Sequence, residues 1–163
     1  MKYVEGDMFK MAEQGLFDFV IQGCNCYNTM GSGVAKTVRD FYKPAYEADL
    51  STKEGDLSKL GKFTVATIKG PFHDSEQFKI INAYTQAGFW DTGKPNVDYG
   101  AVYDCFKSIK LIYDNYPSGL YRFAIPKIGA VRGGGVWSDI EDIIDSVGIV
   151  DLTCVVYNGN LNK

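Results

Sequence analysis

The chain has 163 residues, a length that fits one globular domain with a buried core, and we expect a single domain over residues 1–163. Its 45% hydrophobic and 23% charged composition excludes a disordered chain, and the formal net charge of -3 argues against a broad cationic surface for nucleic acid. No apolar run is long enough to cross a membrane, and the first residues lack the apolar core of a signal peptide. We therefore expect a cytoplasmic protein with no membrane partner, and we expect it to be a monomer.

Apolar residues recur in patterns that predict alternating strands and helices along the chain. Strands are expected at residues 2–4, 19–22, 62–68, 78–85, 121–125 and 152–157. Helices are expected at residues 8–14, 34–44, 98–117 and 138–147. This alternation predicts an α/β fold, a three-layer α/β/α sandwich around a central mixed sheet.

Two of the expected helices carry an apolar face at helical spacing. In the earlier helix this face holds Val34, Ala35, Val38, Phe41 and Tyr42, and Pro44 disturbs the helix near its end. In the later helix the face holds Tyr99, Val102, Tyr103, Phe106, Ile109 and Tyr113, with Asp98 as the expected cap.

The connections between these elements are polar or rich in glycine. Residues 51–61 are charged and are expected on the surface, and residues 69–76 form a hairpin excursion with His73 exposed at its tip. Residues 88–96 contain Phe89 and Trp90 and form a loop that could border a pocket. The 4 cysteines lie mostly in apolar runs, which is typical of buried thiols, and with 1 His and no C-x-x-C pair we expect neither a metal nor a cofactor.

A glycine-bearing loop follows the strand at residues 19–22 and precedes the helix that starts at Val34. Glycines at Gly31 and Gly33 let the backbone approach a phosphate closely, and the first N–H groups of the helix are free to bind it. A short Gly-x-Gly also serves as an ordinary tight turn, and this loop matches neither the P-loop nor the dinucleotide pattern. Both interpretations stay open on this stretch alone.

A second glycine-bearing loop, around Gly133, also lies between a strand and a helix start. In an open α/β sheet such loops gather at the carboxyl ends of the strands, where ligands bind. Two loops that suit phosphate together suggest a diphosphate ligand.

Four stretches, taken together, resemble the macrodomain family of ADP-ribose-binding modules. They are residues 5–8 (Glu-Gly-Asp-Met), residues 21–35 with the first loop, residues 128–137 with the second loop, and residues 155–158 (Val-Val-Tyr-Asn). Cys24-Asn25-Cys26 before the glycines, with Pro126 and Trp137 around the second loop, is similar to ADP-ribose 1″-phosphate phosphatases and their phage-encoded counterparts. Macrodomains that remove ADP-ribose from proteins or nucleic acids are closely related to these phosphatases.

The resemblance implies a ligand, ADP-ribose or one of its derivatives, free or attached to a macromolecule, and a role for each matching residue. Asp7 and the Met8 N–H would bind adenine, and Tyr157 would pack on it, although Asp7 could instead be only a helix cap, and an aromatic that ends a strand is as often a core residue. Asn25 would orient the distal ribose. The remaining implied ligand contacts come from the two loops: Gly31, Ser32, Gly33 and Val34 in the first, and Gly129, Ala130, Val131, Arg132, Gly133 and Gly134 in the second.

The chain departs from the catalytic patterns of its relatives. Gln22 stands where the phosphatase-like relatives have a His, and Gln86 stands where other relatives use a catalytic Lys. The acidic residue of their second loop falls near Gly133. Gln22 and Asn25 are therefore our candidate catalytic residues, although a Gln cannot shuttle protons near neutral pH.

Two functional hypotheses follow. An enzyme would position a water between Asn25, the first-loop amides and the phosphate of the ligand, and would hydrolyse a phosphate monoester or an ADP-ribosyl bond slowly. A Cys24 or Cys26 nucleophile is disfavoured because no His lies nearby in the sequence. Alternatively, the chain is a reader that binds ADP-ribose without turning it over.

Overall fold

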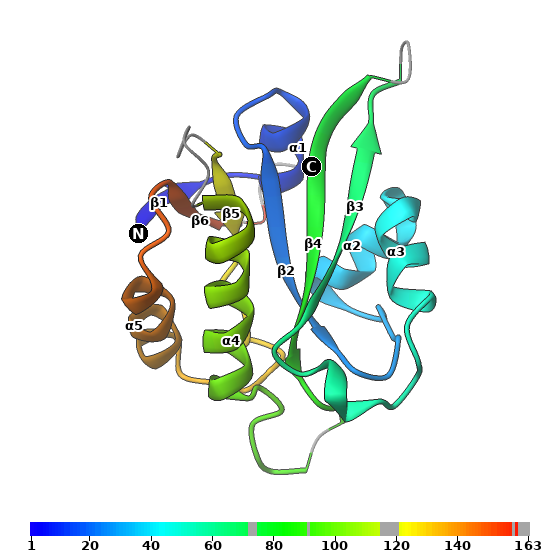
Figure 1. Cartoon of the computed structure of the whole chain (residues 1–163), viewed down its shortest axis with the longest axis vertical. Coiled ribbons are helices and arrows are strands. Elements are labelled where there is room, and N and C mark those ends of the chain that lie inside the picture. The colour runs from blue at the N-terminus through cyan, green and yellow to red at the C-terminus, as the bar shows by residue number, and fades with distance from the viewer. Residues whose placement is uncertain (72–74, 91, 115–120, 158, 160–163) are drawn as a thin grey trace.

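The computed structural model describes residues 1–71, 75–90, 92–114, 121–157 and 159 (Figure 1). Its strands are β1 (Lys2–Glu5), β2 (Phe19–Asn25), β3 (Phe63–Lys69), β4 (Glu76–Gln86), β5 (Phe123–Ile125) and β6 (Leu152–Val156). Its helices are α1 (Met8–Glu13), α2 (Gly33–Phe41), α3 (Lys43–Leu50), α4 (Tyr99–Ile109) and α5 (Trp137–Val147), with a 3-10 turn η1 (Leu57–Lys59) and a wider π-type turn η2 (Lys110–Asp114). Two predicted features, His73 and the helix end near Pro117, lie outside the described residues.

The strands described form one six-stranded sheet in the order β1-β6-β5-β2-β4-β3. Neighbouring strands are parallel except for β3, which pairs antiparallel with β4 as a long hairpin. This confirms the predicted mixed sheet. The strand order places β5 and β2 side by side at the centre, so the loops that follow these two strands leave the sheet next to each other.

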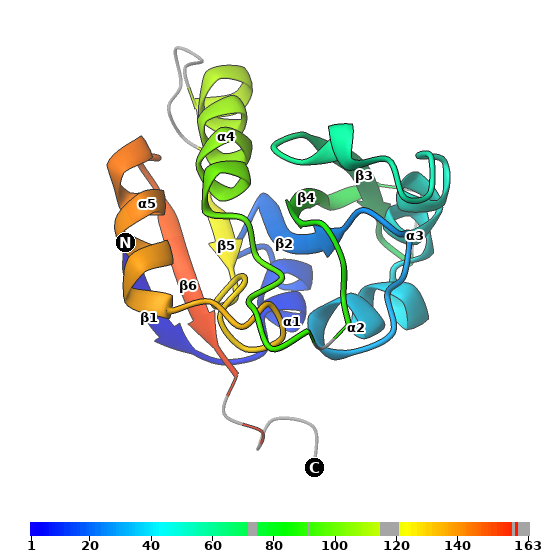
Figure 2. The same cartoon turned by 90° about the horizontal axis from the view of Figure 1, so that it is seen from below.

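Helices cover both faces of the sheet. Buried side chains of α1, α2 and α3 pack with Val20, Ile80 and their neighbours on one face. Buried side chains of α4 and α5 pack with Ile21, Ile81 and their neighbours on the other. Figure 2 shows α4 and α5 on one side of the sheet and α1 and α2 on the opposite side. The α/β/α sandwich expected from the sequence is therefore the fold of this chain.

The helix predicted over residues 34–44 is instead two helices. α2 ends at Phe41, and α3 begins at Lys43 with Pro44 in its first turn, where the missing N–H of proline costs nothing. Because the chain turns at Tyr42, the side chain of Phe41 points away from the core and is 77% exposed, while Tyr42 is buried. The prediction of Phe41 as a core residue is wrong for this reason.

The buried face of α4 is rotated from the predicted one. Val102, Phe106 and Ile109 are buried as expected, but Tyr99 and Tyr103 are exposed. Two small residues, Ala101 and Cys105, take the buried positions instead. Small side chains let the helix lie close to the sheet, and the bulky tyrosines stay at the border with solvent.

No helix among the described residues is long and apolar enough to cross a membrane.

Candidate ligand-binding site

A cavity of about 790 Å³ lies at the carboxyl ends of β2, β4, β5 and β6. Figure 2 looks onto this edge of the sheet, where the loops that precede α2, α4 and α5 converge. Most of the predicted ligand residues line it: Asn25, Gly31, Ser32, Gly33, Val34, Gly129, Val131, Arg132, Gly133, Gly134 and Tyr157. The structure thus brings the two glycine-bearing loops together around one cavity.

The first loop is held in shape by Asn25, which ends β2 and is 8% exposed. Its Oδ1 accepts from the Tyr27 N–H at 2.8 Å, and its Nδ2 donates to the Thr29 hydroxyl at 2.8 Å and the Thr29 carbonyl at 3.1 Å. The loop then enters α2 through Gly33, whose φ of +60° favours glycine. Asn25 therefore both fixes the loop and contributes to the cavity wall.

The amino end of α2 faces the same cavity. Gly33, Val34 and Ala35 form its first turn and line the cavity, and no side chain caps the helix from Ser32. N–H groups of a first helical turn have no acceptor within the helix, and the helix dipole adds partial positive charge there. This end of α2 is suited to an anion.

A buried lysine stabilises the first loop through hydrogen bonds. Lys59 is only 7% exposed, and its Nζ donates to Asn28 Oδ1 at 2.7 Å and to the Thr52 hydroxyl at 3.0 Å. Asn28 belongs to the first loop and has a left-handed φ of +58°. We predicted residues 51–61 to be a plain surface connection, and the burial of Lys59 corrects that prediction, because a charged side chain can be buried once it has polar partners.

The second loop, between β5 and α5, is compact and is tied to the loop before α4. The Gly133 carbonyl accepts from the N–H groups of Asn96 at 2.8 Å and Val97 at 3.1 Å. A Cβ at Gly133 would lie 2.6 Å from the Gly129 carbonyl oxygen, so this position needs glycine. A Cβ at Gly33 would lie 3.9 Å from Arg132 Cγ, which shows that the two loops nearly meet across the cavity.

The cavity is cationic, although the chain carries a net charge of -3. Lys94, Lys127 and Arg132 line it, and none of the described residues that line it is an Asp or a Glu. Like-signed side chains around one cavity favour a ligand of the opposite charge. Together with the helix end and the glycine loops, this charge pattern fits a phosphate-bearing ligand.

Only one of the three residues expected to bind adenine, Tyr157, lines the cavity. Tyr157 lines the cavity and is 55% exposed. Asp7 caps α1, with its Oδ1 accepting from the Phe9 and Lys10 N–H groups at 3.1 Å each, and Met8 is buried. Neither Asp7 nor Met8 is among the residues that line the cavity, and neither is Ala130. The capping role that the sequence left open for Asp7 is present in the structure.

Gln22 lies inside the protein and not in the cavity. It is 1% exposed, and its Nε2 donates to Asn82 Oδ1 at 2.8 Å. Its Oε1 has no hydrogen-bond partner among the described residues. A carboxamide in this position is not placed to contact a ligand, so we drop Gln22 as a catalytic candidate.

Cys24 lines the cavity, but burial raises the pKa of its thiol well above the usual value. Since the thiolate is the reactive form of cysteine, this raised pKa disfavours Cys24 as a nucleophile. Cys26 is fully buried and is not among the residues that line the cavity. No group of three or more potential metal ligands occurs in the described part of the chain.

Sequence reasoning missed several residues of the cavity wall as ligand candidates: Gln86, Lys94, Asn96 and Lys127. Gln86 ends β4, and Lys94 and Asn96 follow it in the loop before α4. Phe89 and Trp90 of the same loop also line the cavity, as the sequence suggested. A usable signal was present, because the end of a strand parallel to β2 must lie at the same edge of the sheet.

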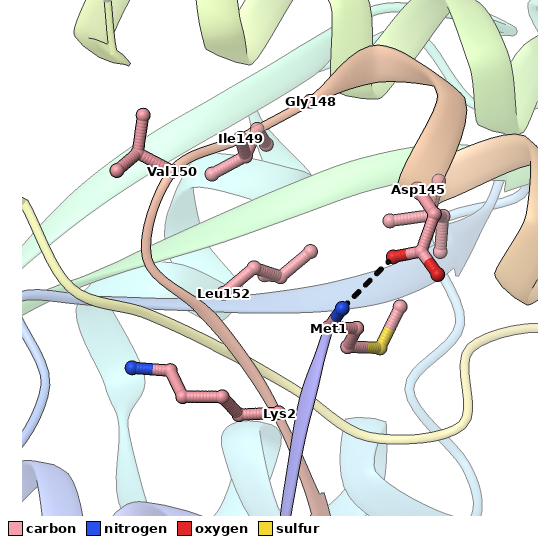
Figure 3. A pocket seen from close by; sticks show the side chains of 8 residues that line it. Met1, Lys2, Asp145, Gly148, Ile149, Val150 and Leu152 are labelled. Atoms are coloured by element: carbon pink, nitrogen blue, oxygen red, sulfur yellow. Dashed lines mark ion pairs between the residues drawn. The ribbon is translucent and has the colours of Figure 1, made fainter.

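A second cavity, of about 520 Å³, lies elsewhere, between the amino end of the chain, β6 and the end of α5. Figure 3 shows the Met1 ammonium pointing at Asp145, which pairs with it at 3.3 Å, while Ile149, Val150 and Leu152 supply apolar walls. Among the residues that the structure describes, Gly148 is the only glycine that lines it, and no helix begins there. We therefore place the candidate site at the larger cavity.

No protein-family model matches the chain. An uncharacterized 17.5 kDa protein from the tk-vs intergenic region of Enterobacteria phage T4 is 35% identical over 149 residues, which cover 90% of this chain and 88% of the phage protein. A DNA ADP-ribosyl glycohydrolase of Mycobacterium tuberculosis is 26% identical over 161 residues. This match covers 95% of the chain but only 41% of the mycobacterial protein.

Solved structures share the fold at low sequence identity. A protein of unknown function from Bacteroides thetaiotaomicron has a TM-score of 0.76 and 23% identity, with 96% of each chain covered. The macrodomain of Thermus aquaticus DarG has a TM-score of 0.67 and 19% identity, with 96% and 97% covered. Thermosipho africanus DarTG in complex with ADP-ribose has a TM-score of 0.71 and 18% identity, with 95% of this chain and 40% of that chain covered.

Proposed function

Because the chain belongs to the macrodomain family, we propose that its cavity binds ADP-ribose and that the protein hydrolyses the bond to the group on the distal ribose. The observation that carries the proposal is a cavity of about 790 Å³ that joins two glycine-bearing loops and a helix amino end with three cations, and with no carboxylate among the described residues that line it. Support also comes from the relatives, one named a DNA ADP-ribosyl glycohydrolase and one solved in complex with ADP-ribose.

The order of the strands indicates how the proposed ligand would be oriented in the cavity. Tyr157 follows β6 and would pack on adenine at one end of the cavity. The diphosphate would lie between the second loop, after β5, and the first loop, after β2. The distal ribose would then lie near Asn25 and the end of β4. Since neighbouring strands are about 4.8 Å apart, the three steps from β6 to β4 span roughly 14 Å.

In this arrangement Asn25 and the amino end of α2 would position the attacking water. Asn25 Oδ1 has a second lone pair beyond the one used by the Tyr27 N–H, so it can accept from a water without releasing the loop. Arg132 and the amides of the first loop would stabilise the negative charge that develops in the transition state. With no His, Asp or Glu among the described lining residues, proton transfer depends on water and ligand phosphate, and turnover would be slow.

The second candidate function is a reader that binds ADP-ribose without hydrolysing it. The same lack of a His or carboxylate in the described cavity wall favours this alternative. Asn25 then serves only to hold the first loop in shape. Binding is common to both functions, and turnover separates them.

Turnover of defined substrates tests the proposal. The purified protein is incubated with ADP-ribose 1″-phosphate and with ADP-ribosylated oligonucleotide and peptide, and released phosphate or ADP-ribose is measured. Release that scales with protein concentration and is lost in Asn25→Ala supports hydrolysis, and the substrate consumed identifies the bond. Saturable binding without release from any substrate would leave the protein as a reader.

A further inference from the structure

Three aromatic side chains, Tyr27, Phe89 and Trp90, form a cluster beside the cavity. The ring centroids of Tyr27 and Trp90 are 5.0 Å apart, those of Phe89 and Trp90 are 5.1 Å apart, and those of Tyr27 and Phe89 are 6.4 Å apart. Phe89 is 53% exposed and Trp90 is 46% exposed, and both line the cavity. We call these three residues the aromatic rim. Exposing so much aromatic surface is unfavourable in a free protein, which suggests that a ligand covers it.

Hydrogen bonds and close packing hold the aromatic rim in place. Gln86 Nε2 donates to the Gly88 carbonyl at 2.8 Å, and Asn96 Nδ2 donates to the Trp90 carbonyl at 3.0 Å. A Cβ at Gly88 would lie 3.0 Å from the Trp90 ring, so the indole packs directly on this glycine. Tyr27 in turn packs against Gly55, where a Cβ would lie 3.2 Å from its ring. Preorganised aromatic side chains bind a flat partner at a low entropic cost.

The aromatic rim lies at one end of the cavity. Phe89 and Trp90 follow β4, whereas Tyr157 follows β6, and β5 and β2 lie between these strands in the sheet. If Tyr157 packs on adenine, as the proposed function requires, then the aromatic rim lies beyond the distal ribose. It is therefore next to the group that the ribose carries.

The charge around the aromatic rim indicates the class of that group. Two cationic residues line the cavity near these aromatic side chains: Lys94, which is in the same loop as Trp90, and Arg132, which lies across the cavity. None of the described residues that line the cavity is an Asp or a Glu. Single-stranded nucleic acids are recognised by this combination, in which aromatic side chains stack on bases and cations contact phosphates. A peptide carries neither a regular row of bases nor a regular row of phosphates.

We propose that the aromatic rim stacks on a nucleobase of a single-stranded nucleic acid whose ADP-ribose occupies the cavity. The inference rests on the proposed function and narrows its substrate class to ADP-ribosylated nucleic acid. Phe89 and Trp90 stack on the base next to the distal ribose, and Lys94 contacts a neighbouring phosphate. These residues set specificity and take no part in the chemical step.

The test compares binding of free and attached ADP-ribose. A dye-labelled single-stranded deoxyoligonucleotide with one ADP-ribosylated base is bound in a stopped-flow instrument, so that anisotropy is recorded before turnover, and ADP-ribose is titrated separately. Trp90→Ala is expected to weaken binding of the oligonucleotide about 5- to 150-fold, the range for one stacked base, while affinity for ADP-ribose changes by less than about 3-fold. Trp90→Phe should retain most of the affinity.

Phe41→Ala is the matched control, because Phe41 is 77% exposed but does not line the cavity, and it should bind both ligands like the wild type. The inference is overturned if the wild type binds the ADP-ribosylated oligonucleotide no more tightly than free ADP-ribose. It is also overturned if Trp90→Ala weakens binding of an ADP-ribosylated peptide to the same degree, or weakens both ligands equally. Absence of any ADP-ribose binding would instead remove the proposed function, and this inference with it.

Discussion

The side chain of Asn25 lines the cavity while it holds the first loop through Tyr27 and Thr29. These two contributions separate in a pair of variants. Asn25→Ala removes the carboxamide, and we expect turnover to fall about 100-fold or more, because the attacking water loses the acceptor that positions it, with less than about a 5-fold loss of ADP-ribose affinity. Steady-state kinetics and a binding titration measure the two effects.

Thr29→Val is the control, because it deletes the hydroxyl that accepts from Asn25 and leaves the carboxamide in place. We expect its turnover to stay within about 3-fold of the wild type, since the Thr29 carbonyl still accepts from Asn25. Equal losses in the two variants would mean that Asn25 acts only by shaping the loop.

Gly133 and Gly31 provide a contrast between two loop glycines. A Cβ at Gly133 would collide with Gly129 backbone at 2.6 Å, whereas nothing lies within 4 Å of a Cβ at Gly31. We expect Gly133→Ala to lower the free energy of unfolding by about 1–3 kcal/mol, and Gly31→Ala to change it by less than about 1 kcal/mol. Urea denaturation of both variants tests this, and equal losses would show that the second loop is not packed as described.

The role of a single residue could be predicted from the sequence where that role depends on residues close to it in the chain. Asp98 was expected to cap a helix, and its Oδ1 accepts from the Ala101 N–H at 2.8 Å. The burial of Gln22 and Lys59 depends on Asn82 and Asn28, which are 60 and 31 residues away in the chain. Such long-range partners leave no local signal in the sequence. The burial of Gln22, which stands where relatives have a catalytic His, therefore could not be predicted.

An ion pair joins the two central strands at the edge opposite the cavity. Asp18 directly precedes β2 and accepts from Arg122, which precedes β5, at Nε and Nη2 at 3.1 Å each and at the backbone N–H at 2.8 Å. Burial raises the pKa of Asp18, but the hydrogen bonds and charge of Arg122 outweigh it and hold that pKa below its usual value. The pair therefore stabilises the fold when Asp18 is ionised.

The sign of the pH dependence follows from the lowered pKa of Asp18. Its contribution is present above the pKa of an unfolded Asp and is lost as the pH falls through the folded value. We expect Arg122→Gln to lower the free energy of unfolding by about 1 kcal/mol at pH 7 and by much less near pH 2. Lys2→Gln, which breaks the exposed pair with Asp151, should cost less than about 0.5 kcal/mol. An effect of Arg122→Gln that grows on acidification would contradict this assignment.

The elements themselves were largely readable from local patterns, while their orientation was not. Alternating strands and helices gave the layered fold, and β2 only continued three residues beyond its predicted end. The rotated face of α4 depends on how closely this helix approaches the sheet. Helical periodicity identifies an apolar stripe, but it does not tell which residues at its borders are buried.

At the scale of the molecule, negative charge dominates overall and positive charge gathers at one edge of the sheet. The chain has a net charge of -3, yet Lys94, Lys127 and Arg132 all line the cavity. The sequence predicted the two loops that build this site, because each follows a strand. Lys94 and Lys127 were not predicted as ligand candidates, although each follows a strand that ends at the same edge of the sheet as β2.

This charge pattern predicts salt-sensitive ligand binding. ADP-ribose at about 100 times its Kd should stabilise the protein by about 2.7 kcal/mol, which corresponds to a rise in Tm of roughly 5–10 °C for a chain of this size. At fixed ligand concentration this rise in Tm should become smaller as the salt concentration increases from 50 to 500 mM, because the screening length falls from roughly 14 Å to roughly 4 Å. Arg132→Gln should show a smaller rise and weaker salt dependence, whereas Arg39→Gln, outside the cavity, should match the wild type. A Tm rise unaffected by salt in the wild type would contradict an electrostatic role for the three cations.

The most direct test of the account is a calorimetric titration of the purified protein with ADP-ribose, with AMP and ribose 5-phosphate as comparison ligands. A cavity that takes adenine, diphosphate and distal ribose together should bind one ADP-ribose per chain, about 10-fold or more tightly than either fragment, since each fragment leaves part of the site empty. Absence of saturable binding, or equal affinity for AMP and ADP-ribose, would contradict it.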